Sequence, residues 1–351
     1  MLRYVLKRLV AGFAVIIAII MLVTTIIFLA PVDPAQLTFG QRAETGAVAA
    51  KRKALGLDQP LHIQMAYYLR DISPINIIST AAADVLRYQY INLVPLGQNY
   101  LILKKPYLRE SYQTGRSVST ILAEAIPKTI LLALFAIVLA SFLGIFLGVI
   151  AAVYKNSFND NLAVVCSVIG YSLPSYVTAI LLALIFGYYL GDWTGLNVQG
   201  SIIELNDFGD PVYVFKNLLL PGIALGIRPV AIITLLTRSS MLDVLQMDYM
   251  RTGKAKGLQK TNLLFKHGVR NALNPVATAI TGWFAALLAG AFFVENVFNF
   301  KGLGEVTVTA LIHFDIPVVM GAVIFTAITF VLINVLVDIL YALLDPRTVL
   351  V

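Results

Sequence analysis

Six long apolar stretches run along the chain, and each contains at most one charged residue. A helix needs about 20 apolar residues to cross the hydrocarbon core of a bilayer. Because lipid offers no hydrogen bonds to the backbone, each spanning segment has to satisfy its own polar groups as a helix. We therefore predict an all-α integral membrane protein with six transmembrane helices. The predicted spans are Leu9–Val32, Thr129–Val153, Leu162–Leu190, Leu218–Leu236, Pro275–Val294 and Val318–Val337.

Lysine and arginine residues gather on one side of this topology. The connection between the fourth and fifth spans, residues 238–274, carries seven Lys and Arg residues against two Asp. The N-terminus adds three basic residues on the same side, whereas residues 191–217 on the opposite side hold four acidic residues and one lysine. Short loops rich in Lys and Arg remain in the cytoplasm. We therefore predict a multi-pass protein of the cell membrane with both termini in the cytoplasm.

The spans divide the chain into three predicted parts. Residues 1–32 form a retained N-terminal transmembrane helix, because this apolar stretch is longer than the core of about 7–15 residues in a signal peptide. Residues 33–128 form an external lobe or loop region, in which Pro60–Asp71 has the spacing of an amphipathic helix and Tyr88–Tyr107 predicts extended structure or loop. Residues 129–351 form a five-helix core with a cytoplasmic loop at 238–274.

Composition narrows the class of protein. Only 13% of the residues are charged, against about 25% in soluble proteins, and the mean hydropathy is +0.83. This composition argues against a soluble enzyme and a nucleic-acid binder, and topology accounts for the net charge of +7. The single cysteine, Cys166, excludes an intramolecular disulfide and a cysteine-based metal cluster. The three histidines fall in separate segments, so we expect no metal site and no catalytic constellation.

The loop between the fourth and fifth spans carries the strongest functional signal. Two short helices are predicted there, from Gln246 to Lys256 and from Thr261 to Leu273, the second ending before Pro275. Membrane topology alone is enough to explain a basic amphipathic loop of this kind. It is also typical of a helix that docks into a groove of a cytoplasmic partner.

The residues at both ends of the first loop helix are of types that stabilise helix ends. Asp248 lies in its first turn, where the helix dipole favours an anion, and Lys254 and Lys256 lie in its last turn, where the dipole favours cations. Gly257 then occupies the position just past the helix end, which often has left-handed backbone geometry. A helix, a glycine and a second helix are thus predicted in succession.

The segment Asp248–Leu258 resembles the cytoplasmic coupling loop of type I ABC importer permeases, in particular the dipeptide/oligopeptide/nickel permease family. Any one such segment is a weak signal, but several occur in the family's order along nearly the whole chain. The further similar segments are Met1–Tyr4 with Lys7-Arg8, Ala30–Pro34, Leu55–Leu61, Ser111–Arg116, His267–Pro275, Val294–Phe298, Gly302–Gly304 and Leu343–Arg347.

The resemblance implies the membrane subunit of a binding-protein-dependent importer. Such a subunit pairs with a second, homologous permease, and the pair works with two cytoplasmic ATPase subunits and an extracytoplasmic substrate-binding protein. This chain has no Gly-x-x-x-x-Gly-Lys-Ser/Thr loop, so we expect it to bind no cofactor, with ATP on the partner subunits. The residues implied in ATPase coupling are Asp248, Tyr249, Arg251, Thr252, Gly253, Lys254, Lys256 and Gly257.

Short peptides are the substrate that the family resemblance favours. Nickel complexes and oligosaccharides are alternative substrates, since members of the family carry them and no residue in this sequence distinguishes among the three. A passive channel or a membrane scaffold is an alternative of another class.

Three residues in the spans are candidates for the translocation path: Pro174, Arg228 and Pro229. The prolines predict kinks that either line a cavity or serve packing alone. Arg228, near the middle of its span, either contacts a peptide carboxylate or pairs with an acidic residue on a neighbouring helix, and we favour pairing.

We also predict roles for two residues within the spans and one beside them. Gly144 and Gly148 predict a close helix contact, either within the chain or with the partner permease. Glu295, near the external end of the fifth span, predicts an interfacial anchor.

Overall fold

A computed structural model describes residues 2–29, 45–54, 58–79, 88–97 and 99–344. The chain divides into two compact units. Unit 1 comprises residues 1–12, 125–308 and 328–351, and unit 2 comprises residues 13–124 and 309–327. The end of the first predicted span, residues 30–32, and the family-like segments at 30–34, 55–57 and 345–347 lie outside the described residues.

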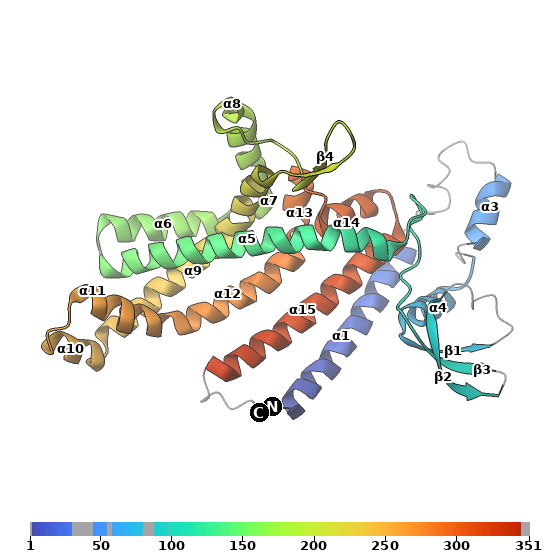
Figure 1. The fold of residues 1–351 in the computed structure, drawn as a ribbon, viewed down its shortest axis with the longest axis horizontal. Coiled ribbons are helices and arrows are strands. Elements are labelled where there is room, and N and C mark those ends of the chain that lie inside the picture. Colours follow the sequence, from blue (N-terminus) through green and yellow to red (C-terminus); the bar gives the residue numbers. More distant parts are fainter. Residues whose placement is uncertain (1, 30–44, 55–57, 80–87, 98, 345–351) are drawn as a thin grey trace. The chain divides into compact units, whose positions relative to one another are not determined.

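Helices dominate the described chain (Figure 1). Four of them have residues in both units: α1 (Leu2–Leu29), α5 (Val118–Val153), α14 (Leu303–Ile312) and α15 (Ile316–Leu344). Unit 1 also holds α6 (Phe158–Ser172), α7 (Ser175–Leu182), the π-helix η2 (Ala183–Tyr189), α8 (Gly191–Thr194), β4 (Ile203–Leu205), β5 (Pro211–Tyr213), the 3-10 helix η3 (Phe215–Leu218), α9 (Leu219–Gln246), α10 (Asp248–Ala255), α11 (Lys260–Asn262), the π-helix η4 (Leu263–Val269), α12 (Arg270–Gly290) and α13 (Phe292–Phe298). Unit 2 also holds α3 (Thr45–Ala54), α4 (Leu61–Ile72), β1 (Ile75–Ser79), β2 (Tyr90–Leu96) and β3 (Asn99–Lys104).

The described helices include several that are long and apolar enough to cross a membrane. Three qualify singly: Val118–Val153, Phe215–Gln246 and Ile316–Val337. The number rises to five if each of two bent helix pairs counts as one span. α1 covers most of the first predicted span, but its described apolar part, Val10–Ile26, is shorter than the three helices that qualify singly. The described residues thus show a mostly helical protein with three to five candidate spans, and six spans stay a prediction.

Pro174 divides the third predicted span. α6 and α7 meet at an angle of 103°, and Pro174 precedes the first residue of α7. Proline disfavours helical geometry in the residue before it, and Leu173 accordingly has an extended backbone. The predicted kink at Pro174 is confirmed, and it is a break between two helices.

The second predicted loop helix and the fifth predicted span form one continuous run of helix. The helix runs from Lys260 to Leu288 and then bends by 58° into α13. The prediction that the second loop helix ends before Pro275 is wrong, because α12 continues through this proline. Ala272 and Val276, on either side of Pro275, are both buried. Packing of that face maintains the helix despite the hydrogen bond that proline removes.

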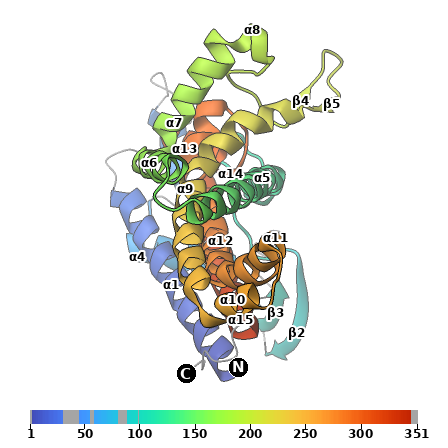
Figure 2. The ribbon, with the colours of Figure 1, turned by 90° about the vertical axis from the view of Figure 1, so that its left-hand side faces the viewer.

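α9 lies at the centre of unit 1 (Figure 2) and is the most buried of the three singly qualifying spans. It packs against α6, α7 and α12. Gly148 of α5 lies directly on it: a Cβ there would be 2.6 Å from the carbonyl oxygen of Thr234. At Gly144 a Cβ would be 2.6 Å from Ile233. The contact predicted for these two glycines is therefore made within the chain, to α9.

Unit 2 contains a three-stranded antiparallel sheet with the order β1-β3-β2. β2 and β3 confirm extended structure between Tyr88 and Tyr107, and α4 confirms the amphipathic helix predicted over Pro60–Asp71. Ile78, Tyr88 and Ile102 form a small core on one face of the sheet. That this region is external stays a prediction.

A buried aspartate joins α4 to the sheet. The Asp71 carboxylate accepts hydrogen bonds from the hydroxyl of Tyr88, at 2.5 Å, and from Nε of Arg109, at 2.7 Å. Its backbone carbonyl accepts one from Nζ of Lys104, at 2.8 Å. Burial lowers the pKa of Arg109, but the charge of Asp71 and its hydrogen bond together outweigh burial and raise the pKa.

We expect the Gly148→Ala substitution to destabilise unit 1 by about 1–3 kcal/mol, because the new methyl group would press on the backbone of α9. Thermal unfolding of the purified protein in detergent would show this as a lower Tm. Gly282→Ala is the matched control, since a Cβ at Gly282 meets no atom within 4 Å. Equal Tm values for the two variants would contradict the close α5–α9 contact.

Candidate functional site

The predicted coupling segment begins with an abrupt change of direction. α9 ends at Gln246 and α10 begins at Asp248, so that Met247 alone separates the two helices. Met247 has an extended backbone, with φ −68° and ψ 149°, and its carbonyl accepts a hydrogen bond from the backbone N–H of Met250, at 3.0 Å. Because a single residue joins them, the two helices can move very little relative to each other.

The inner face of α10 packs against its neighbours. Met250 is 4% exposed, and Gly253, one turn later, is also buried. This spacing of three residues puts both on one helix face. Met250 joins a cluster with residues of α5, α9, η4 and α12. The buried members of this cluster are Ala152, Met241, Val244, Met250, Leu263 and Ala272.

The outer face of α10 is polar and open. The side chain of Asp248 is 96% exposed and that of Arg251 is 75% exposed, with 3.7 Å between their charged groups. Thr252, Lys254 and Lys256 are exposed as well. The structure thus brings Asp248, Arg251 and Lys254 onto one short helix with an accessible surface. Lys256 is not in the last turn, as predicted, but is the C-cap residue that follows it. α10 packs against η4 and lies at one end of α9 (Figures 1 and 2).

Gly257 ends α10 as the sequence predicts. Its φ is +76°, in the left-handed region. The backbone N–H of Leu258 donates to the carbonyl of Gly253, at 3.2 Å, and that of Gly257 donates to the carbonyl of Lys254, at 3.0 Å. These two bonds form a Schellman motif, in which residues beyond the helix satisfy its last carbonyls.

Tyr249 connects α10 to the helix that follows. Its hydroxyl accepts a hydrogen bond from Nδ2 of Asn271, at 3.0 Å, and lies 3.5 Å from the carbonyl oxygen of His267. Nδ2 of Asn271 also donates to that carbonyl, at 3.0 Å. α10 is therefore attached both to α9 and to the start of α12.

An ion pair secures α9 close to this segment. Nη2 of Arg238 donates to Oδ2 of Asp160 at 2.8 Å, and Nε of Arg238 donates to the other carboxylate oxygen. Asp160 lies in the first turn of α6 and accepts a further hydrogen bond from the backbone N–H of Asn156, at 2.8 Å. No local sequence pattern relates two residues so far apart in the chain, so this pair is found only in the structure.

Arg228 has fewer polar contacts than Arg238. Its guanidinium carbon lies 5.3 Å from the ring centroid of Tyr171, in the last turn of α6. Its Nε is buried without a hydrogen-bond partner, and the acidic partner that we favoured is absent from the described residues. An arginine at mid-span costs about 2.5–3.5 kcal/mol on insertion scales. A cation–π contact returns about 0.5–2 kcal/mol, so the balance remains unfavourable.

The two candidate prolines lie near this arginine in the chain. Pro229 is buried inside α9 directly after Arg228. Pro174 follows Tyr171 by three residues and starts the break before α7. Whether these residues line a translocation path stays a prediction.

Glu295 is not an interfacial anchor. It is fully buried, and its carboxylate accepts hydrogen bonds from the hydroxyl of Thr129 and from the backbone N–H of Gly304, each at 2.7 Å. A Cβ at Gly302 or Gly304 would clash with that carboxylate or with the backbone of Phe292. Glu295 therefore satisfies the N-terminal amides of α14, a role that its sequence position does not reveal.

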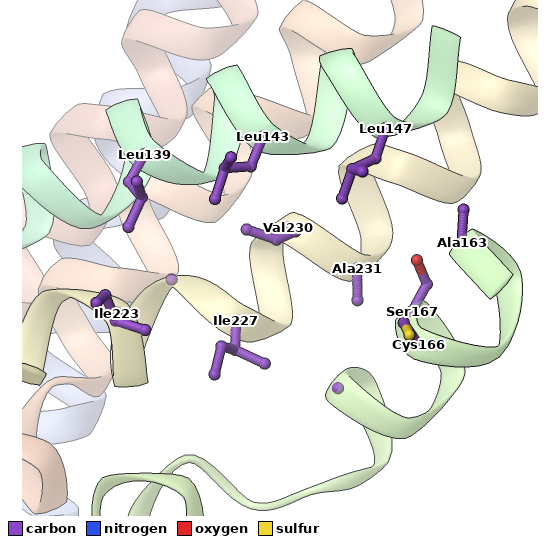
Figure 3. A pocket seen from close by; sticks show the side chains of 12 residues that line it. Leu139, Leu143, Leu147, Ala163, Cys166, Ser167, Ile223, Ile227, Val230 and Ala231 are labelled. Carbon is purple, nitrogen blue, oxygen red and sulfur yellow. The ribbon is translucent and has the colours of Figure 1, made fainter. Parts of the chain in front are cut away.

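A small apolar cavity of about 170 Å³ lies between α5, α6 and α9 (Figure 3). Leu139, Leu143 and Leu147 line it from α5, and Cys166 and Ser167 line it from α6. No group of three potential metal-ligating side chains occurs among the residues that the structure describes.

Comparison with known families places the chain. Residues 144–350 match the family described as "Binding-protein-dependent transport system inner membrane component". Residues 1–133 match the family described as "Binding-prot-dependent transport system membrane comp, N-term". The chain belongs to this family of transport components. It is a permease subunit of a binding-protein-dependent ABC importer and not itself an enzyme.

Named relatives extend over the whole permease. The dipeptide transport system permease protein DppB of Alkalihalophilus pseudofirmus is 34% identical, with 99% of each chain covered. The glutathione transport system permease protein GsiC of Salmonella paratyphi A is 34% identical, with 99% of this chain and 98% of the relative covered. GsiC of Escherichia coli K12 is 32% identical over the same shares.

Membership of the family indicates where the permease is located and which kinds of protein it works with. It is an inner membrane component, and a substrate-binding protein and further ABC subunits are its partners. These partners need a surface on the permease, and α10 offers an exposed charged surface backed by a buried apolar one.

We expect the Gly257→Val substitution to disrupt the permease's attachment to its ATPase subunits, because a β-branched residue strains the left-handed geometry at this position. Co-purification of the ATPase with tagged permease would fall several-fold. Gly257→Asn should retain binding, since asparagine tolerates this geometry. Gly268→Ala is a second control, since a Cβ there makes only ordinary contacts. Full ATPase recovery with Gly257→Val would rule out a role for this turn in docking.

Proposed function

We propose that this permease forms half of the translocation path of an ATP-driven importer for short peptides, and that α10 docks its cytoplasmic ATPase subunits. One observation carries the docking role: α10 presents an exposed charged face while its opposite face is buried against α9, η4 and α12. The relatives named as dipeptide and glutathione permeases support a peptide substrate.

The attachments of α10 suggest how ATPase motion reaches the membrane helices. A force on α10 acts on α9 across the single residue Met247 and on α12 through Tyr249 and Asn271. Packed helices move as nearly rigid bodies. Displacement of α10 would therefore tilt α9 and α12 together, which is the kind of motion that alternating access requires.

The full assembly that we propose contains more than this chain. A second, homologous permease supplies the other half of the path, two ATPase subunits bind ATP on the cytoplasmic side, and a binding protein delivers the peptide from outside. Both termini and α10 then face the cytoplasm, and the lobe at 33–128 faces outward. No cofactor is assigned to this chain.

The test is transport by the assembled complex in proteoliposomes. We expect uptake of a labelled dipeptide that needs the binding protein and ATP, and that stops with a non-hydrolysable ATP analogue. Uptake that persists without ATP would instead indicate a passive channel. ATP-dependent uptake of a nickel complex or an oligosaccharide, but not of peptides, would contradict the substrate assignment. Absence of an ATPase from the purified complex would contradict the importer itself.

Charge reversal of Lys254 and Lys256 to Glu should weaken ATPase binding several-fold at low salt and much less at high salt, because salt screens exposed charges. Binding of the purified ATPase to the permease would be titrated at two ionic strengths. Lys105→Glu, an exposed charge in unit 2, is the matched control and should change nothing. A loss that is equal at both ionic strengths would indicate misfolding and not a lost electrostatic contact.

A further inference from the structure

Arg228 has hydrogen-bond donors that the described residues leave unused. Its Nε is buried and makes no hydrogen bond, and the described residues give it neither an ion pair nor a hydrogen-bond acceptor. Arg238 on the same helix is different, since two of its nitrogens bond the carboxylate of Asp160. Ionisable groups within membrane helices are expensive and are usually paired. Arg228 therefore requires an acceptor from outside the described residues.

The ring of Tyr171 satisfies only part of this requirement. An aromatic face attracts the positive charge of the guanidinium, but it does not accept the N–H groups, which lie in the guanidinium plane. A planar group with two anionic oxygens matches those donors best, since arginine binds carboxylates through two parallel hydrogen bonds. The missing acceptor is thus best described as a carboxylate.

The surroundings of Arg228 suit a passing ligand. Arg228 faces the last turn of α6, just before the 103° break at Pro174. Tyr171, before the break, is 45% exposed, and Tyr176, after it, is 47% exposed. Helices break at membrane depth where the backbone is covered by protein or borders an aqueous path. Transporters commonly place substrate sites at such breaks.

We propose that Arg228, held against the ring of Tyr171, binds the C-terminal carboxylate of the transported peptide as it passes the break between α6 and α7. The proposal rests on the peptide import proposed above. Arg228 contacts the substrate, and Tyr171 is a positioning residue. Pro174 then places the break between α6 and α7 beside this site.

Two other sources of anionic oxygen exist. A lipid phosphate lies at the membrane interface, about 15 Å from the centre of the bilayer, whereas Arg228 lies near the middle of the apolar helix Phe215–Gln246. An acidic side chain of the second permease, or one of this chain outside the described residues, is the other source. Both differ from the substrate carboxylate in one respect: they would support uptake of any peptide, whatever the chemistry of its C-terminus.

The test compares a dipeptide with its C-terminal amide in proteoliposomes that contain the complete importer. Each is supplied with saturating binding protein, and the ratio of the two uptake rates is measured. The same binding protein serves every variant, so its own preference cancels when ratios are compared. Because both rates come from one preparation of vesicles, the ratio is also independent of how much complex has folded.

We expect Arg228→Gln to lower the dipeptide-to-amide ratio about tenfold, the usual effect of losing a hydrogen bond to a charged group. Arg228→Lys should retain part of the preference, because it keeps the charge without the planar pair of donors. Tyr171→Phe is the matched control and should behave as wild type, since the ring remains. Tyr171→Leu should lower the ratio.

An unchanged ratio with Arg228→Gln would overturn the proposal. If uptake of both peptides falls equally and the second permease no longer co-purifies, Arg228 pairs with that subunit and the proposal is wrong. If the equal fall depends on the anionic lipid content of the vesicles, the acceptor is a lipid and the proposal is again wrong. A wild-type importer that transports neither peptide overturns the proposed function and this inference with it.

Discussion

Close contact between helix backbones at α9 governs the arrangement of unit 1. Gly148 of α5 lies against the carbonyl of Thr234, and Gly226 of α9 lies against the carbonyl of Ala136. No side chain separates the helices at these points, so α9 cannot shift alone. Since only Met247 separates α9 from α10, the packing that fixes α9 also fixes the position of the candidate docking helix.

The same unit meets the demand for hydrogen bonds where its helices end or break. Glu295 and Thr129 reach the first amides of α14, and a Schellman motif serves the last carbonyls of α10. At both ends the protein itself supplies the hydrogen bonds that the helix leaves open. Arg228 departs from that pattern, which is why it stands out as a place for a ligand.

Local chemistry was sufficient to predict the features that depend on neighbouring residues. The break at Pro174 and the left-handed Gly257 both follow from the restricted geometry of single residues. Long-range packing was not accessible in this way. α12 continues through Pro275 because its flanking residues are buried in the tertiary structure, and the Asp160–Arg238 pair joins distant segments. The six predicted spans also exceed the three to five candidate spans that the length and apolarity of the described helices establish.

Cys166 is the single cysteine of the chain, and it is exposed where α5, α6 and α9 enclose the small cavity. A thiol-specific spin or fluorescent probe would therefore attach to the natural sequence at one defined point, with no background cysteines to remove. Because α6 precedes the Pro174 break, such a probe would report how this half of the broken helix moves during turnover. The permease thus carries its own reporter site beside the helix that connects to α10.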